Sequence, residues 1–321
     1  MRRRVRVLLA ALSALPLTLA VVPSAHAADP TGMTSGFYVD PDSSAKKWAA
    51  ANSGDGRAPA VDASLANTPT ARWFGSWSGT IGTATGAYAG AADHHDKLPV
   101  MVAYNIHLRD SCGGHSGGGA SSPSAYASWI AQFAGGIAAR PAVVLLEPDS
   151  FADYGCLNQT QIRERQGMLS GALAEFGRQA PHTWVYLDAG NPGWVSAATM
   201  AQRLHEAGLR QAHGFSLNIS NYYTTAQNTA YGNAVNGELA ARYGYTKPFV
   251  VDTSRNGNGS NGEWCNAAGR RIGTPTQLGG GAEMLLWIKA PGESDGNCGV
   301  GTGSTAGQFL PEVAYKMIYG Y

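Results

Sequence analysis

Charged residues are scarce in this chain of 321 residues, and the two signs nearly cancel. Only 14% of the residues are charged, with 23 Lys and Arg against 22 Asp and Glu, so the formal net charge is +1. A chain with no basic excess offers no general electrostatic attraction for nucleic acid or for an anionic membrane surface. We therefore expect neither as a partner.

Long apolar segments are absent after the first residues of the chain. The beginning itself combines basic residues 2–4, an apolar run over residues 7–22 and the small-residue sequence Ala25-His26-Ala27. This order is typical of a secretory signal peptide. We predict that residues 1–27 are a signal peptide and that residues 28–321 form one secreted, extracellular domain. A retained membrane anchor is the alternative.

Cysteine is rare, and its spacing does not indicate a zinc site. The four residues Cys112, Cys156, Cys265 and Cys298 contain no Cys-x-x-Cys pair. An even number in an exported protein favours two disulfides, for which three pairings are possible. Because each cysteine follows the end of an expected strand, we predict the pairs Cys112–Cys156 and Cys265–Cys298, each joining two loops of one face.

What the chain does contain is a repeated alternation of short apolar strands with helices. We expect strands at residues 71–77, 99–105, 141–146, 184–188, 213–220, 248–252 and 284–289. We expect helices at residues 45–51, 124–139, 160–178, 196–206, 226–243 and 305–318. This alternation indicates βα units around a parallel sheet. The length of the domain favours a barrel over an open sheet.

Acidic side chains follow the ends of most of these strands. The apolar run over residues 143–146 changes at once to Glu147, Pro148 and Asp149. Because proline removes a ladder donor, the strand must end there, and Asp149 lies at the edge where such folds place their active sites. Apolar surroundings raise the pKa of a carboxyl, as a general acid requires. A turn aspartate is the alternative for Asp149 alone, but repetition of the pattern favours catalysis.

Tryptophans lie in the same segments as these acids. Indole rings beside carboxylates and amides suit the apolar faces and hydroxyls of sugar rings. We expect Trp194 and Trp264, in polar glycine-rich loops, to be ligand platforms, and Trp287, inside a strand, to be core. The chain has neither a P-loop nor a His-Glu-x-x-His zinc helix. Carboxylates are then the only catalytic groups that occur in number at the strand ends, and two of them can hydrolyse a glycosidic bond.

Seven segments carry a resemblance to a known family: residues 104–110, 144–149, 186–190, 218–222, 251–259, 263–265 and 286–296. Together they resemble glycoside hydrolase family 6, the inverting cellulases of bacteria and fungi, from about Phe37 to the end of the chain. It implies a distorted seven-stranded parallel β/α barrel that hydrolyses β-1,4-glucan with inversion. Such a reaction requires only water, so we expect no cofactor and no metal. We also expect the domain to be a monomer.

The resemblance also implies individual roles. Asp149 would be the general acid, with Asp110 holding its proton in place and stabilising positive charge on the sugar. Tyr104 would press the reacting sugar away from its relaxed chair, and Asp295 matches the proposed base. Expected substrate-binding residues are Trp73, Ser116, Asp188, Asn191, Trp194, Asn218, Asn221, Trp264, Lys289 and Glu293.

Two departures from the family pattern leave alternatives open. Ser111 separates Asp110 from Cys112, and Asn191 replaces a histidine that the family usually has. We predict a secreted endo-β-1,4-glucanase, because the segments that follow Glu263 and Asp295 are too short to roof a tunnel. The alternatives are an exo-acting cellobiohydrolase, an enzyme for another β-glucan such as a mixed-linkage one, and a non-catalytic carbohydrate-binding relative.

Overall fold

A computed structural model describes residues 29–112 and 116–321, so the expected signal peptide lies outside the described residues. The strands are β1 Arg72–Phe74, β2 Val100–Ala103, β3 Ala142–Leu146, β4 Thr183–Asp188, β5 Gly214–Leu217, β6 Phe249–Asp252, β7 Gln277–Leu278 and β8 Met284–Leu286. The α-helices are α1 Ser44–Ala51, α2 Ala58–Val61, α3 Ile81–His94, α4 Pro123–Ile137, α5 Gln159–Gln179, α6 Ala197–Glu206, α7 Thr225–Tyr243 and α8 Pro311–Tyr319.

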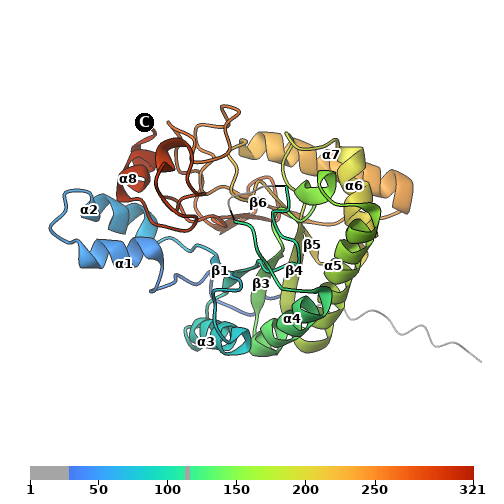
Figure 1. Cartoon of the computed structure of the whole chain (residues 1–321). Coiled ribbons are helices and arrows are strands. Elements are labelled where there is room, and N and C mark those ends of the chain that lie inside the picture. Colours follow the sequence, from blue (N-terminus) through green and yellow to red (C-terminus); the bar gives the residue numbers. More distant parts are fainter. Residues whose placement is uncertain (1–28, 113–115) are drawn as a thin grey trace, which may run out of the picture.

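The strands form one curled sheet with the order β1-β2-β3-β4-β5-β6-β8-β7 (Figure 1). Every neighbouring pair from β1 to β8 is parallel, which confirms the predicted distorted seven-stranded parallel β/α barrel. Between β1 and β8, the backbone N–H of Ala71 donates to the carbonyl of Trp287 at 2.8 Å. The short β7 pairs antiparallel with β8. The prediction missed β7 because its two residues are exposed and carry no apolar pattern.

Apolar residues on both faces of the strands explain the layered packing. All five residues of β3 and all six of β4 are buried, as a strand with covered faces requires. Side chains such as Val102, Leu145 and Val250 fill the inside of the curl. Outside it, helices α3 to α7 pack on the sheet, and Phe133 of α4 meets Phe176 of α5 at a ring separation of 5.7 Å (Figure 1).

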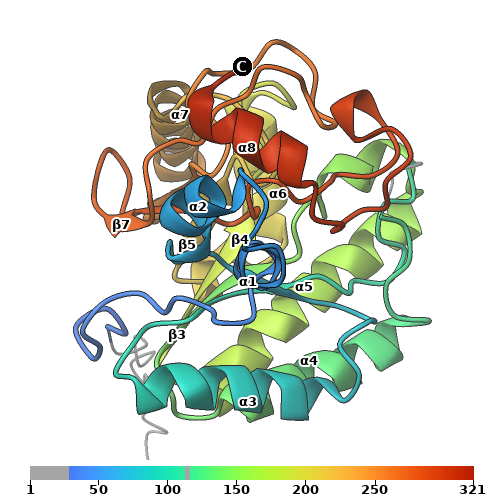
Figure 2. The ribbon, with the colours of Figure 1, turned by 90° about the vertical axis from the view of Figure 1, so that its left-hand side faces the viewer.

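A separate group of helices covers the region where β1 and β8 approach each other. Helices α1, α2 and α8 lie side by side there (Figures 1 and 2). Their apolar residues form a cluster around Trp287, which is buried and therefore belongs to the core, as predicted. Helix α8 begins at Pro311, so the predicted start at residue 305 was six residues early.

Helix α3 was not predicted, because its sequence is rich in glycine, which disfavours helices. The structure shows what the glycines do. A Cβ added to Gly82 would lie 3.1 Å from the carbonyl oxygen of Gln132 on α4, and one added to Gly86 would lie 3.3 Å from that of Gly136. Close contact between α3 and α4 therefore outweighs local propensity.

Candidate active site

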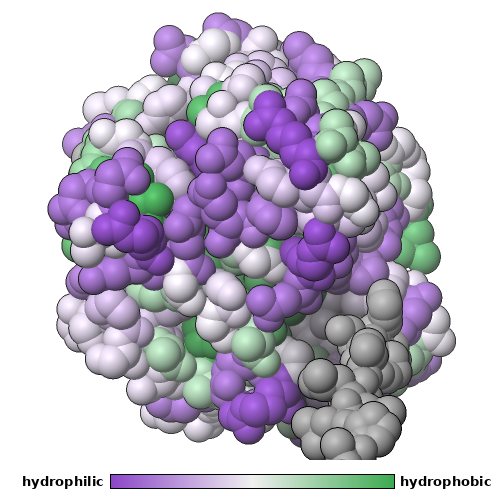
Figure 3. Space-filling view, turned by 90° about the vertical axis from the view of Figure 1, so that its right-hand side faces the viewer, coloured by the Kyte–Doolittle hydropathy of each residue, from purple (hydrophilic) through white to green (hydrophobic). Residues whose placement is uncertain are grey.

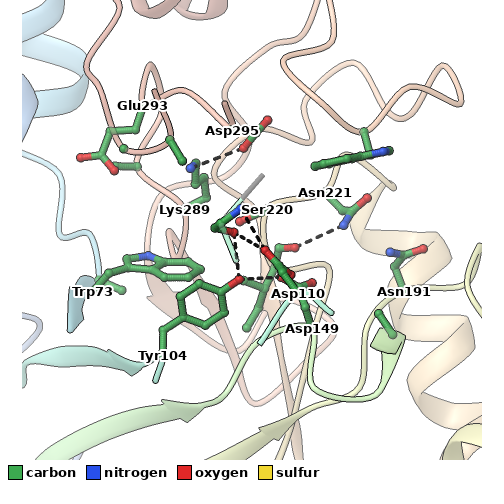
Figure 4. A pocket seen from close by; sticks show the side chains of 18 of the residues that line it. Trp73, Tyr104, Asp110, Asp149, Asn191, Ser220, Asn221, Lys289, Glu293 and Asp295 are labelled. Atoms are coloured by element: carbon green, nitrogen blue, oxygen red, sulfur yellow. Dashed lines mark hydrogen bonds and ion pairs between the residues drawn. The ribbon is translucent and has the colours of Figure 1, made fainter. Parts of the chain in front are cut away.

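A cavity of about 910 Å³ opens at the carboxyl ends of the parallel strands. Figure 4 shows Asp295, Lys289 and Glu293 on one side of it and Tyr104, Asp110 and Asp149 on the other. Of the site residues predicted from the sequence, the following line it: Trp73, Tyr104, Asp110, Ser116, Asp149, Asn191, Trp194, Asn221, Trp264, Lys289, Glu293 and Asp295.

The backbone is strained at this edge of the sheet. Left-handed φ values occur at Asp110 (55°), Glu147 (52°), Asp149 (69°), Asn218 (69°) and Ser220 (58°). Non-glycine residues adopt this conformation rarely and at an energetic cost, which the surrounding contacts must offset. The strain lies where the strands deliver polar side chains, so it serves to aim those side chains.

Glu147 fixes the turn that presents Asp149. Its carboxylate is fully buried and accepts hydrogen bonds from the backbone N–H groups of Asn105 and Ile106, each at 2.9 Å. These bonds tie the end of β3 to the segment that follows β2. Burial raises the pKa of Glu147 to about 7, against the opposing effect of those N–H donors.

Asp149 lies among other acids. Its carboxylate accepts a long hydrogen bond of 3.5 Å from the Tyr104 hydroxyl. Burial in the cavity wall raises the pKa of Asp149 well above its ordinary value, and the negative charges of Asp188 and Asp110 raise it further. Asp149 is thus a carboxyl group that retains its proton where an exposed aspartate would not.

Asp110 and Ser116 form a small network beside this acid. The Ser116 hydroxyl and backbone N–H donate to Asp110 Oδ2 at 2.5 and 3.0 Å. The same hydroxyl lies 3.1 Å from the Tyr104 hydroxyl. The insertion of Ser111 therefore leaves Ser116 in contact with Asp110, and Ser116 links Asp110 to Tyr104, whose hydroxyl contacts Asp149.

Asp295 has the opposite electrostatic environment. Both of its oxygens accept from Arg255 Nη1, at 3.0 and 2.9 Å, and Lys289 Nζ lies 3.4 Å from Oδ1. Burial opposes ionisation of Asp295, but the charges of Arg255 and Lys289 outweigh it and lower the pKa. A further bond comes from the backbone N–H of Asn266 at 2.9 Å. One wall of the cavity therefore holds a carboxyl with a raised pKa and the other a carboxyl with a lowered pKa.

Aromatic rings line the cavity between and beyond these carboxyls. Trp73 donates its indole N–H to the carbonyl of Ile288 at 2.8 Å, and its ring meets that of Tyr104 edge-on at 5.2 Å. Trp77 and Trp264 line the cavity while being 58% and 52% exposed. Flat apolar faces next to hydrogen-bonding groups suit a sugar polymer.

Two predicted binding residues do not line the cavity. Asp188 is buried and accepts the backbone N–H of Asp149 at 2.9 Å, and burial raises its pKa to about 6. Asn218 is also buried and donates to the carbonyl of Asp252 at 2.8 Å. The expectation that these two bind substrate directly does not fit their placement, because Asp188, the last residue of β4, and Asn218, the residue after β5, are buried in the wall. They support the residues that face the cavity.

Comparison with known proteins identifies the family. The sequence matches glycosyl hydrolases family 6 over residues 33–319. The chain belongs to glycosyl hydrolases family 6. Endoglucanase 1 of Streptomyces halstedii is 80% identical over 321 residues, which is all of both chains. Endoglucanase 1 of Streptomyces sp. strain KSM-9 is 44% identical over 280 residues, 85% of this chain and 75% of that one.

Solved structures agree with this assignment. The endoglucanase Cel6 from Mycobacterium tuberculosis, in complex with methyl-cellobiosyl-4-deoxy-4-thio-β-D-cellobioside, is 36% identical and matches with a TM-score of 0.82. The match covers 91% of this chain and 99% of that one. The predicted resemblance to family 6 is thereby confirmed, and with it the classification as a glycoside hydrolase.

Asn191, which stands where family 6 usually has a histidine, lines the cavity with an almost fully buried side chain. The side chain is 1% exposed, and its Oδ1 accepts the N–H of Gly193 at 2.9 Å. The amide nitrogen has no hydrogen-bond partner among the described residues, although Asn191 lines the cavity. Nearby, a Cβ on Gly190 would lie 2.1 Å from the Trp194 ring, so glycine lets that ring rest on the backbone.

Some residues of this family 6 site were missed by the sequence analysis. Arg255, the partner of Asp295, is 2% exposed and follows β6 in a polar segment. An arginine shortly after a buried strand is a usable signal, but its partner is 40 residues away. Ser44 was also missed, and its hydroxyl donates to Glu293 at 2.7 Å. Nothing local marks Ser44, which lies at the start of α1.

Both predicted disulfides are present. Cys112–Cys156 joins the segments after β2 and β3, and Cys265–Cys298 joins those after β6 and β8. Each therefore connects two loops that contribute to the cavity.

Within the described ranges, no group of three or more His, Cys, Asp or Glu side chains is arranged to hold a metal ion. None of the described helices combines the length and hydrophobicity needed to cross a bilayer.

Proposed function

We propose that the protein is a secreted, inverting endo-β-1,4-glucanase that acts on cellulose or related β-glucans. The observation that carries the proposal is the pair of opposed carboxyls. Asp149 has a raised pKa and Asp295 a lowered one, and both line one cavity. A protonated and an ionised carboxyl flanking one bond are what an inverting glycoside hydrolase requires. Secretion is supported by the pattern of residues 1–27.

The reaction follows from this arrangement. Asp149 donates its proton to the glycosidic oxygen, and the C–O bond breaks as the leaving sugar regains its hydroxyl group. Positive charge develops on the remaining sugar ring, and the carboxylate of Asp110 stabilises it. Water attacks that carbon from the opposite face and gives a proton to Asp295, directly or through a second water. Tyr104 lies against the reacting sugar and disfavours its relaxed chair.

An endo-acting enzyme is favoured by the openness of the cleft. Trp77 and Trp264 line the cavity and yet remain more than half exposed, so this part of the groove is not roofed. A polymer can then enter sideways at an internal bond. The names of the two Streptomyces relatives, both endoglucanases, support the same assignment.

Hydrolysis of carboxymethylcellulose, followed by viscosity and reducing ends together, tests the proposal. Wild type should lower the viscosity quickly for few new reducing ends, and Asp149→Asn should lose nearly all activity because it has no proton to donate. Release of mainly cellobiose with little change in viscosity would indicate an exo-acting enzyme. An active Asp149→Asn variant would contradict the role of the acid, and an inactive wild type would favour a binding protein or another glucan.

A further inference from the structure

Arg165 is a charged residue that lies behind the cavity and is not among its lining residues. It belongs to α5 and is 1% exposed. A buried arginine is costly unless its N–H groups find acceptors. The acceptors that Arg165 finds belong to the two loops that carry Asp110 and Asp149.

The guanidinium group of Arg165 joins these loops through backbone carbonyls. Its Nη2 donates to the carbonyls of His107 and Leu108, at 3.1 and 2.6 Å. Its Nη1 donates to the carbonyl of Ser150 at 3.0 Å. The first two acceptors lie just before Asp110, and the third directly follows Asp149. The Arg165 side chain therefore bridges the backbone of the loop that carries Asp110 and the backbone of the loop that carries Asp149.

Asp153 holds the guanidinium in this position. Its Oδ2 accepts from Arg165 Nη1 at 2.7 Å, and both side chains are almost fully buried. Its Oδ1 accepts the backbone N–H of Cys112 at 3.3 Å. The Cys112–Cys156 disulfide links the same two loops covalently. The ion pair and the disulfide thus both hold the loop of Asp110 against the loop of Asp149.

The loops need such support because their backbone is strained. Leu108, Asp110 and Asp149 all have left-handed φ values, of 61°, 55° and 69°. Residues in this conformation relax when their contacts are removed. A lysine could not replace Arg165 here, because a single ammonium group cannot reach acceptors that a planar fork of donors spans.

We propose that Arg165, held by Asp153, is a positioning residue that sets the placement of Asp110 relative to Asp149 and so determines how well Asp149 works as the general acid. The inference rests on the proposed function, since it concerns the proton donor of that reaction. Arg165 itself touches neither the cavity nor a reacting atom. Its effect passes through the two loops.

The charges around Asp149 give the expected direction of the effect. Burial raises the pKa of Asp149 first, followed by the charges of Asp188, Asp110 and Asp153, while the hydrogen bond from Tyr104 lowers it. If the loop of Asp110 moves away, part of this elevation is lost. A general acid must be protonated, so the activity would then disappear at a lower pH as the pH rises.

The test compares kcat, KM and the pH profile of kcat on cellopentaose for wild type, Arg165→Lys and Leu239→Ala. The lysine keeps the charge, so any change reports geometry. Leu239 is a buried core residue of α7, and its truncation controls for a general loss of stability. We expect Arg165→Lys to lower kcat by about 10- to 100-fold, as small misplacements of reacting groups do. KM should stay within about twofold, and the alkaline limb should move to lower pH.

Several outcomes would overturn the inference. If wild type is active and Arg165→Lys matches Leu239→Ala in kcat and pH profile, Arg165 is only structural. If Arg165→Lys does not fold, Asp153→Asn replaces it, with an expected smaller fall in kcat at the pH optimum and an unchanged KM. The alkaline limb is not the readout for this variant, because loss of the Asp153 charge lowers the pKa of Asp149 directly. A wild-type kcat at the optimum in Asp153→Asn would overturn the inference in that case. Absence of wild-type hydrolysis would instead contradict the proposed function, which separates the two failures.

Discussion

Lys289 and Arg255 both lie against Asp295, but only Lys289 also lines the cavity. Replacing it in Lys289→Gln should leave the Arg255 pair in place and remove one of the two charges that lower the pKa of Asp295. That pKa should rise. Because the proposed base must be ionised, activity is lost as the pH falls through the pKa of Asp295, so the acid limb should move to higher pH.

The pH profile of kcat on cellopentaose measures this shift. Lys316→Gln, a change to an exposed lysine of α8, is the matched control and should keep the wild-type profile. An acid limb that stays in place in Lys289→Gln would show that Asp295 is not the group that titrates there. The KM of Lys289→Gln should also rise, since the ammonium group is expected to bind a sugar hydroxyl.

A second residue-scale prediction concerns stability. Burial raises the pKa of Glu147 from 4.5 to about 7, so the folded protein holds this proton more tightly than the unfolded chain does. The resulting stabilisation is fully present below pH 4.5 and is lost as the pH rises to about 7. It amounts to on the order of 3 kcal/mol. Thermal unfolding across this window should show a decline for wild type that is smaller in Glu147→Gln. A pH-independent difference between the two would contradict the prediction.

At the residue scale, side chains that directly follow a strand could be predicted from the sequence. Side chains whose partners lie far away in the sequence could not. Asp149 and Asp110 were predicted because a strand end is visible in the chain. Asp188 was assigned to substrate, because the sequence does not reveal that its strand turns the carboxylate toward the N–H of Asp149. Arg165 and Arg255 were missed, because their value depends on acceptors brought close only by folding.

At the scale of elements, apolar strands were predicted well, and the glycine-rich helix α3 was missed. The buried strands β2 to β6 carry runs of apolar residues that cannot suit an exposed segment. The predicted helix at residues 196–206 is confirmed as α6, and Ser196 caps it, since its hydroxyl accepts the N–H of Thr199. Helix α3 was missed because packing against α4, and not propensity, selects its glycines. A local pattern cannot show a contact with a helix that comes some 40 residues later.

The Cys265–Cys298 disulfide connects the loop of Trp264 to the loop of Asp295, the proposed base. Asn266, next to Cys265, donates its N–H to Asp295 and accepts the N–H of Asp295 in return. Opening this bridge in the double variant Cys265→Ser/Cys298→Ser releases 33 residues of chain. The expected loss of stability is roughly 3–4 kcal/mol on chain-entropy grounds. Activity should fall as Asp295 loses its fixed position.

The other bridge provides the comparison. Cys112→Ser/Cys156→Ser opens a sequence separation of 44 residues and should cost a similar amount of stability. It acts on the loops of Asp110 and of Asp149, the proposed acid, so its kinetic effect should appear in the alkaline limb. The effect of the Cys265–Cys298 variant should appear in the acid limb. Thermal unfolding and pH profiles of both variants measure this. Identical profiles would show that the bridges stabilise the fold without positioning the carboxyls.

The whole molecule brings these elements into one curled sheet whose open cleft contains the opposed carboxyls. The order of strands follows the chain from β1 to β6, so the sequence alternation alone fixes most of the topology. The approach of β1 to β8 cannot be read in the same way, because it depends on the curvature of the sheet. That closure brings Trp73 to the carbonyl of Ile288, 215 residues later, and so completes one wall of the cavity.

The surface of the molecule favours a single chain in solution. Large exposed hydrophobic residues are few among the described residues, and two of them, Trp77 and Trp264, belong to the cleft. On the face of Figure 3, hydrophobic residues are scattered among hydrophilic ones. A stable dimer requires roughly 800 Å² of well-packed surface from each partner, with an apolar centre. We therefore expect light scattering to give the mass of one chain, 33.5 kDa or less after removal of the signal peptide, at all concentrations. A mass that doubles with concentration would contradict this, and its dependence on a soluble glucan would show whether the exposed tryptophans of the cleft form the contact.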